Sequence, residues 1–232
     1  MNMKGRIETI QNRIAIAAKR SHRDPADITL IAVTKTHPAT LIDTALAAGL
    51  RRIGENKIQE AEDKLPLLTQ PWDEFHFIGH LQSNKIKKLM PLKPALIHSI
   101  DRFSTAQKLS QWCTAHQRHQ DILLQVNTSG EVSKFGCHPD ELPQLCEDVA
   151  ALPNLHIQGL MTIGIFSDDE TAVRNCFILL RNLRDAIQQN PPAGVKMHHL
   201  SMGMTNDFEI AIEEGATLVR IGSGLFGSRT YT

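Results

Sequence analysis

The sequence predicts a single (β/α)8 TIM barrel with an extra N-terminal helix, formed as one domain by residues 1–232. Strand-like and helix-compatible segments alternate along the chain without a low-complexity linker. Eight such units within about 200 residues match a closed barrel better than an open doubly wound sheet, which usually needs fewer strands. No Gly-x-Gly-x-x-Gly sequence follows the first strand-like run, which argues against a dinucleotide-binding unit.

The first twenty residues predict an amphipathic helix. Ile7, Ile10, Ile14 and Ala17 fall at helical spacing, with charged residues around the other face. The segment lacks the continuous apolar core of a signal peptide, and the chain contains no uninterrupted run of eighteen apolar residues. We therefore expect a folded helix packed on the barrel, and no membrane association.

The strand-like runs are short, apolar and separated by turn residues. They are 28–35, 51–56, 74–79, 95–100, 121–127, 157–163, 196–201 and 216–222.

Two helices between these runs carry terminal signals. The segment 168–189 opens with Ser167 and Glu170 at the spacing of a capping box. Another helix is expected to begin after Asn206, with Glu209 three residues on, and to end before Gly215, a residue suited to a left-handed C′ position.

Composition narrows the classes of partner. The 25 basic and 25 acidic residues cancel, so no global field favours nucleic acid or an acidic membrane surface. The run Lys85, Lys87 and Lys88 fits a solvated helix face. The four cysteines show neither Cys-x-x-Cys spacing nor the density of a disulfide scaffold, which favours a reducing, cytoplasmic setting.

Barrel geometry places functional groups at the carboxyl ends of the strands. Lys35 ends the first strand-like run with the same side-chain parity as Ile31 and Val33. Either it marks the point where the strand emerges into water, or it is a desolvated amine able to form an imine with a carbonyl compound. The other candidates on this rim are Asn56, Ser201, Arg220, Gly222 and Ser223.

Small residues cluster after the last two strand-like runs, in "LSMGMTND" and "VRIGSGLFG". Glycines and hydroxyls near a helix N-terminus suit a phosphate dianion, although the glycines alone could simply form tight turns. Two such clusters on adjacent strands, opposite a rim lysine, favour the phosphate. Together with an imine-forming lysine they suggest pyridoxal 5′-phosphate (PLP) or a sugar-phosphate carbonyl.

The motifs "AVTKTHP", "IGENKIQEAEDK", "HFIGHLQSNK", "HSIDR", "GLMTI" and "LSMGMTNDFEIAIEEGATLVRIGSGLFG" span nearly the whole chain. In this order they resemble the pyridoxal phosphate homeostasis proteins, small barrels akin to the N-terminal domain of alanine racemase. The resemblance implies PLP as cofactor, held by Lys35 as an internal aldimine. It further implies that Ser201, Gly222 and Ser223 hold the phosphate, that Asn56 lies beside the ring, and that Arg220 faces the pyridine nitrogen.

The chain departs from this family pattern at some positions. Ser223 stands where relatives often have threonine, which keeps the hydroxyl. His37 replaces a second lysine of some relatives, which argues against a lysine-to-lysine handover of cofactor. Lys134 matches a family lysine near the entrance; it is either a secondary contact or a solvated loop lysine.

The residues predict a carrier without catalytic activity. A cationic Arg220 facing the pyridine nitrogen disfavours its protonation, which weakens the ring as an electron sink. The only tyrosine, Tyr231, lies beside the C-terminus. No compact metal-ligand spacing appears, and the strand histidines are expected to be hydrogen-bonded structural groups, with His76 and His80 near the ring. Met161, Met202 and Met204 are expected as apolar walls.

Three functions follow as alternatives. The first is a monomeric homeostasis protein that buffers PLP and delivers it to PLP-dependent apoenzymes, with an indirect effect on amino-acid pools. The second is a small racemase-like enzyme, which requires a second proton-transfer group beside the lysine. The third is a Schiff-base aldolase, which would not need Arg220.

Overall fold

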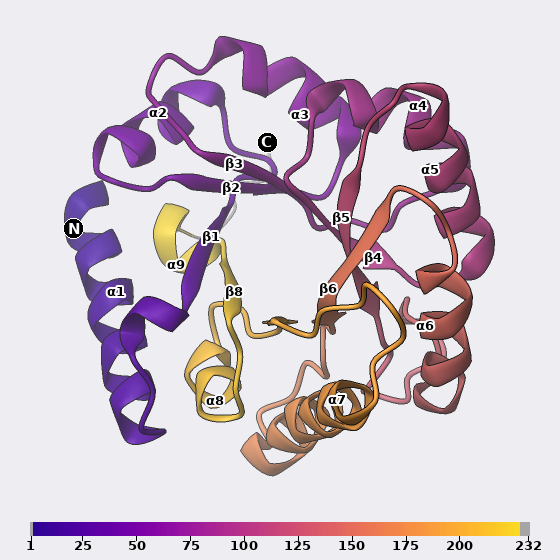
Figure 1. Cartoon of the computed structure of the whole chain (residues 1–232). Coiled ribbons are helices and arrows are strands. Elements are labelled where there is room, and N and C mark those ends of the chain that lie inside the picture. The colour runs from indigo at the N-terminus through magenta and orange to yellow at the C-terminus, as the bar shows by residue number, and fades with distance from the viewer. Residues whose placement is uncertain (1, 228–232) are drawn as a thin grey trace.

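The computed structural model describes residues 2–227, which form a closed parallel barrel. Each strand pairs with its neighbours in sequence, and β1 closes the barrel on β8, with Ile31 in register with Arg220. Figure 1 shows the helices outside this ring of strands. The strands are β1 Thr29–Val33, β2 Arg52–Glu55, β3 Glu74–Phe77, β4 Leu96–Ile100, β5 Gln120–Gln125, β6 Leu155–Met161, β7 His199–Ser201 and β8 Leu218–Ile221.

All eight predicted strands are confirmed. Most are shorter than their apolar runs, which continue into the loops, whereas β5 and β6 begin one and two residues before the predicted runs. The helices are α1 Met3–Arg20, α2 Ala39–Ala47, α3 Ile58–Lys64, α4 Ile86–Leu89, α5 Phe103–Ala115, α6 Leu142–Ala150, α7 Glu170–Gln189, α8 Phe208–Glu213 and α9 Ser223–Phe226.

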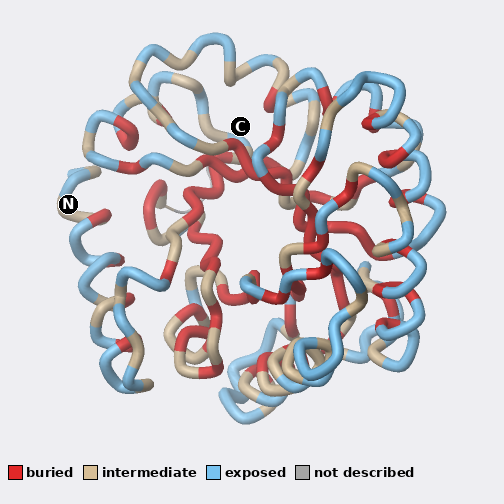
Figure 2. The backbone as a smooth tube through the Cα atoms, viewed as in Figure 1, coloured by how far each residue is buried: buried red, intermediate tan, exposed pale blue. Residues whose placement is uncertain are grey.

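Apolar side chains pack on both sides of the strands. The larger core lies between strands and helices, and Figure 2 shows the buried segments concentrated in the central ring. A smaller cluster brings together residues of five strands, which can meet only inside the barrel: Ile31, Leu96, Leu123, Met161 and Leu218. The interior is therefore a packed layer, as in other barrels of this type.

The N-terminal helix is confirmed, and it packs against α8 and α9. The side chain of Asn2 caps α1 by accepting a hydrogen bond from the Gly5 amide, and the predicted isoleucines are buried. Arg13 pairs with Glu209 on α8 through two hydrogen bonds of 2.7 and 2.8 Å. The helix lies on the outside of the barrel beside α8 and α9 (Figure 1).

The predicted capping residues of two helices are wrong. The N-cap of α7 is Asp169, whose carboxylate accepts the amides of Thr171 and Ala172, while Ser167 accepts the amide of Asp169. A carboxylate two residues closer to the helix makes the stronger cap.

Helix α8 begins one residue later than Asn206 suggested. Its N-cap is Asp207, and the Glu209 side chain is used by Arg13 instead of a cap. The predicted end is confirmed, because Gly215 follows the helix with a left-handed φ of +99°.

Surface and cysteine predictions also agree with the structure. Lys85, Lys87 and Lys88 are exposed. The four cysteines are buried free thiols. None of the helices within residues 2–227 has the length and apolar character to cross a membrane.

Candidate functional site

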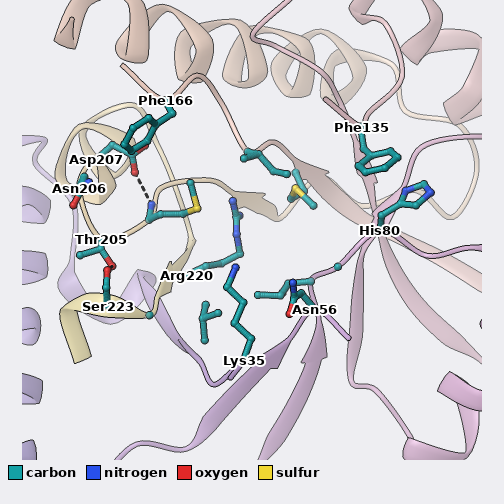
Figure 3. A pocket seen from close by; sticks show the side chains of 17 residues that line it. Lys35, Asn56, His80, Phe135, Phe166, Thr205, Asn206, Asp207, Arg220 and Ser223 are labelled. Atoms are coloured by element: carbon teal, nitrogen blue, oxygen red, sulfur yellow. Dashed lines mark hydrogen bonds between the residues drawn. The ribbon is translucent and has the colours of Figure 1, made fainter. Parts of the chain in front are cut away.

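A cavity of about 650 Å³ opens at the carboxyl ends of the strands. Five of the six predicted site residues line it: Lys35, Asn56, Arg220, Gly222 and Ser223. In Figure 3, Lys35 and Arg220 point into the same part of the cavity, with Asn56 beside them. Residues from both ends of the chain thus meet in one site.

The parity of β1 directs Lys35 into this cavity. Ile31 belongs to the apolar layer inside the barrel, and Val33 and Lys35 line the cavity above it. Lys35 is half-buried. The lysine therefore extends the interior row of its strand and does not simply turn outward into water.

The loop that follows Lys35 is held by a charged network on α3. Thr36 adopts a left-handed φ of 67°, unusual for a β-branched residue. Its amide donates to Glu60 at 2.6 Å, and Lys64 binds both Glu60 at 2.6 Å and the Thr34 carbonyl at 3.1 Å. These contacts fix the backbone on both sides of Lys35.

A buried carboxylate supports the same network. Glu55 is fully buried at the end of β2, where it accepts from the Thr34 hydroxyl at 2.7 Å and from Lys64 at 3.1 Å. Burial raises the pKa of this carboxyl, and the two hydrogen-bond donors act against that rise. Glu55 is a support of the lysine loop that the sequence analysis missed.

Asn56 brings an unsatisfied polar atom to the cavity. Its Oδ1 is buried and has no hydrogen-bond partner in the structure. The close approach of the next strand fixes its backbone, since a Cβ added at Gly79 would lie 2.0 Å from the Asn56 carbonyl oxygen. A buried acceptor without a donor is costly, so a ligand that donates a hydrogen bond fits at this position.

Arg220 forms the floor of the cavity. Its guanidinium donates to the Ser201 hydroxyl at 2.5 Å and to the Thr162 carbonyl at 2.8 Å. Burial lowers the pKa of Arg220 to about 10, partly offset by the nearby Asp207. At neutral pH the side chain therefore remains a cation, held from below by uncharged oxygens.

Ser201 lies beneath the cavity and not in its lining. Its side chain is fully buried between Arg220 and His98, whose Nδ1 lies 2.9 Å from the hydroxyl. Thr205, four residues later, lines the cavity. Because Ser201 is the last residue of β7, its side chain still belongs to the barrel interior.

Thr205 and Ser223 form a pair of hydroxyls at the edge of the cavity. Their oxygens lie 3.2 Å apart, and the Gly224 amide donates to Thr205 at 3.2 Å. In Figure 3 they lie on the opposite side from His80 and Phe135. Thr205 stands in the quoted "MGMTND" segment, where a hydroxyl in the loop after the strand was the available signal.

Aromatic and apolar side chains form the remaining walls. The His80 ring stacks on Phe135 with 3.8 Å between centroids, and Phe166 lies at the mouth. Of the predicted methionines, Met161 and Met204 line the cavity, whereas Met202 is buried elsewhere in the core. His76, which was expected near the ring, also lies outside the lining. It is buried in the barrel, where its Nδ1 lies 3.0 Å from His98.

A carboxylate stands among these walls. Asp207 accepts a hydrogen bond from the Met204 amide at 2.6 Å, and burial raises its pKa. This contact shapes the loop that carries Thr205, which the sequence analysis did not foresee.

The two entrance residues considered from the sequence lie apart from the lining. Lys134 donates to the Gly164 carbonyl at 2.8 Å and pairs with Glu131 at 2.6 Å, which ties two mouth loops together. The His37 ring lies 4.8 Å from that of Phe226. Both residues have structural contacts near the mouth.

Comparisons with known proteins agree with this architecture. The family model described as "Alanine racemase, N-terminal domain" matches residues 6–230. Curated proteins named "Pyridoxal phosphate homeostasis protein" match throughout, at 42% identity in Aquifex aeolicus, covering all of both chains. The one from Pseudomonas aeruginosa is 44% identical and covers 97% of this chain and 95% of its own.

Solved structures are similar over the same length. A protein of Bifidobacterium adolescentis has a TM-score of 0.91 at 37% identity, covering 96% of this chain and 94% of its own. PipY of Synechococcus elongatus with PLP bound has a TM-score of 0.81 at 34% identity, covering 97% and 100%. An alanine racemase of Clostridium difficile, at 16% identity and a TM-score of 0.77, shares the fold over 57% of its chain and 99% of this one.

Sequence identity over the full chain and the closed barrel lead to the same assignment. The chain therefore belongs to the family of the alanine racemase N-terminal domain and, within it, to the pyridoxal phosphate homeostasis proteins.

Proposed function

We propose that this protein binds PLP covalently through Lys35 and serves in PLP homeostasis, holding and releasing the cofactor without turning over an amino acid. One observation carries the proposal: Lys35 and Arg220 enter one cavity together, beside a hydroxyl pair. The curated relatives named for PLP homeostasis and the PLP-bound PipY structure support the choice of ligand.

The residues of the cavity fit the polar groups of PLP. The Lys35 amine is the nucleophile for the aldehyde, and the cationic Arg220 is a donor for the pyridine nitrogen. Thr205 and Ser223 offer hydroxyl donors to the phosphate, next to Gly222. The unsatisfied Oδ1 of Asn56 can accept from the phenolic hydroxyl of the ring. When bound, PLP supplies an electrophilic carbonyl and an electron-withdrawing ring.

The role of carrier rests on the charge of Arg220. A guanidinium that donates to the pyridine nitrogen leaves that nitrogen unprotonated, and the ring then withdraws electrons poorly. Tyr231 lies outside the described residues, and no proton-transfer role is assigned to it. We infer a single-domain, monomeric, cytoplasmic protein whose partners are PLP and PLP-dependent apoenzymes, and which does not bind nucleic acid or membranes.

The racemase-like alternative is favoured by one observation, the match to the alanine racemase N-terminal domain. This chain nevertheless covers only 57% of the Clostridium difficile racemase, whose remainder has no counterpart in the matched barrel. A Schiff-base aldolase would not need the cationic Arg220 in the cavity.

Titration of the purified protein with PLP tests the proposal. We expect a saturable visible absorption band that disappears when an apoenzyme removes the cofactor. Unphosphorylated pyridoxal should bind more weakly, because it cannot use the hydroxyl pair. Absence of the band at any PLP concentration would refute the proposed function.

A further inference from the structure

A continuous row of hydrogen bonds crosses the barrel interior beneath Arg220. From Arg220 it passes to Ser201 at 2.5 Å, to His98 at 2.9 Å and to His76 at 3.0 Å. It ends at Glu74, 3.0 Å from His76 and 2.8 Å from Arg52.

The row joins the two ends of the barrel. Glu74 and Arg52 are the first residues of β3 and β2, and their side chains are about two-fifths exposed. Ser201 ends β7, and Arg220 forms the floor of the cavity at the opposite end. Between them His76 and His98 are 3% and 0% exposed, so bulk solvent does not reach the middle of the row.

The two end groups fix the direction of the hydrogen bonds that they make themselves. Hydrogen bonds from His76 and Arg52 lower the pKa of Glu74 to about 2, so the carboxylate is ionised and can only accept. His76 must therefore donate through Nε2. If the His76 ring is neutral, its Nδ1 accepts, and His98 donates to it through Nε2.

The same argument continues to Arg220. Burial lowers the pKa of His98 well below its ordinary value, so the ring is neutral and its Nδ1 is an acceptor. Ser201 then donates its hydroxyl proton to His98 and turns its lone pairs toward Arg220. A guanidinium can only donate, so this arrangement gives Arg220 an acceptor and His98 a donor.

We propose that Ser201, His98 and His76 are positioning residues that act through Arg220, forming a one-way donor chain that ends at Glu74. The chain anchors the guanidinium by an uncharged acceptor and keeps the only carboxylate of the row three side chains away. No anion of this row touches Arg220, although the charge of Asp207 in the cavity wall also acts on the guanidinium. The effect on the cofactor rests on the proposed function, whereas the proton positions do not.

The proton positions are tested without any cofactor. Nitrogen-15 NMR of the full chain at neutral pH should show His98 protonated at Nε2 and unprotonated at Nδ1. A proton on Nδ1 of His98, or a doubly protonated His98 ring, would overturn the donor chain whatever the protein binds.

Two substitutions of His98 form a matched pair. His98→Asn places an amide oxygen where Nδ1 stood and keeps an acceptor for Ser201, whereas His98→Gln places its amide near Nε2 and loses it. We expect His98→Gln to bind PLP about tenfold more weakly than His98→Asn, since a hydrogen bond to a charged group depends on this acceptor.

A space-filling role for His98 predicts equal losses for both variants, which would refute the proposal. Ser201→Ala removes the hydroxyl that accepts from Arg220 and should weaken PLP binding as much as His98→Gln does. It also shifts the pH dependence of the bound-cofactor absorption band, because Arg220 then keeps only the Thr162 carbonyl as an acceptor. An unchanged band in Ser201→Ala would contradict the positioning role even if both His98 variants failed to fold.

Discussion

The Lys64 ammonium lies 3.1 Å from the buried carboxylate of Glu55, and the same ammonium holds the backbone immediately before Lys35. The Lys64 side chain is 14% exposed and that of Glu55 is fully buried. The pair therefore couples the stability of the barrel to the placement of the site lysine.

Removing one partner of this pair should be strongly destabilising. Lys64→Met leaves Glu55 buried without a counter-charge, and we expect a loss of about 3 kcal/mol in the free energy of unfolding at pH 7. Adding Glu55→Gln should recover part of it, since an amide keeps the bond from Thr34. Urea unfolding measures both, with the exposed Lys88→Met as control. No recovery in the double variant would contradict the coupling.

Loss of the hydroxyl pair should affect only ligands that carry a phosphate. We expect Thr205→Ala with Ser223→Ala to weaken PLP binding by about 1.5–3 kcal/mol per hydrogen bond lost, with little change for pyridoxal. Ser201→Ala should weaken both ligands alike, because it acts through Arg220. Fluorescence titration with the two ligands distinguishes these patterns; a phosphate-specific loss in Ser201→Ala would restore that residue to the phosphate site.

The carboxylate of Glu74 should make the free energy of unfolding depend on pH. Its pKa falls from 4.5 to about 2 on folding, so its contribution is complete above about pH 4.5 and is lost as pH falls toward 2. Glu74→Gln should therefore be less stable than the wild type at pH 7, and the difference should shrink at pH 3. The exposed Glu147→Gln serves as control in urea unfolding. A difference in the free energy of unfolding that grew on acidification would contradict this prediction.

The fold was predictable because its signals are local. Short apolar runs separated by turn residues indicate strands, whichever strands they later pair with. The helical spacing of the isoleucines in α1 likewise indicates which face of the helix is buried. The wrong caps of α7 and α8 have a different cause. Asp169 and Ser167 both suit a cap, and only the three-dimensional course of the loop decides which carboxylate or hydroxyl reaches the free amides.

The site was predictable where the strand end itself carries the group. Lys35, Asn56 and Arg220 follow from barrel geometry, since their strands deliver them to one rim. Thr205 and Phe135 were missed because they lie on loops whose path the sequence does not specify. The placement of Ser201 was not predictable for another reason. A shift of one position along a strand decides whether a hydroxyl faces the cavity or the barrel interior beneath it.

The distinction between carrier and enzyme rests on proton exchange at Cα. Incubated with D- or L-alanine in deuterium oxide, the PLP-loaded protein should incorporate no more Cα deuterium than Lys35→Ala with the same PLP. The cationic Arg220 opposes ring protonation and so disfavours the carbanion that exchange requires. Proton NMR of the recovered alanine measures the result. Rapid exchange lost in Lys35→Ala would instead favour the racemase-like enzyme.

Covalent attachment of PLP at Lys35 is tested most directly by borohydride reduction of the loaded protein, followed by digestion and mass spectrometry of the peptides. We predict a pyridoxyl group on the Lys35 peptide, no such label in Lys35→Ala, and full labelling in Lys57→Ala, whose exposed lysine lies outside the cavity. A stoichiometric label on another lysine, or labelling that persists in Lys35→Ala, would contradict the account.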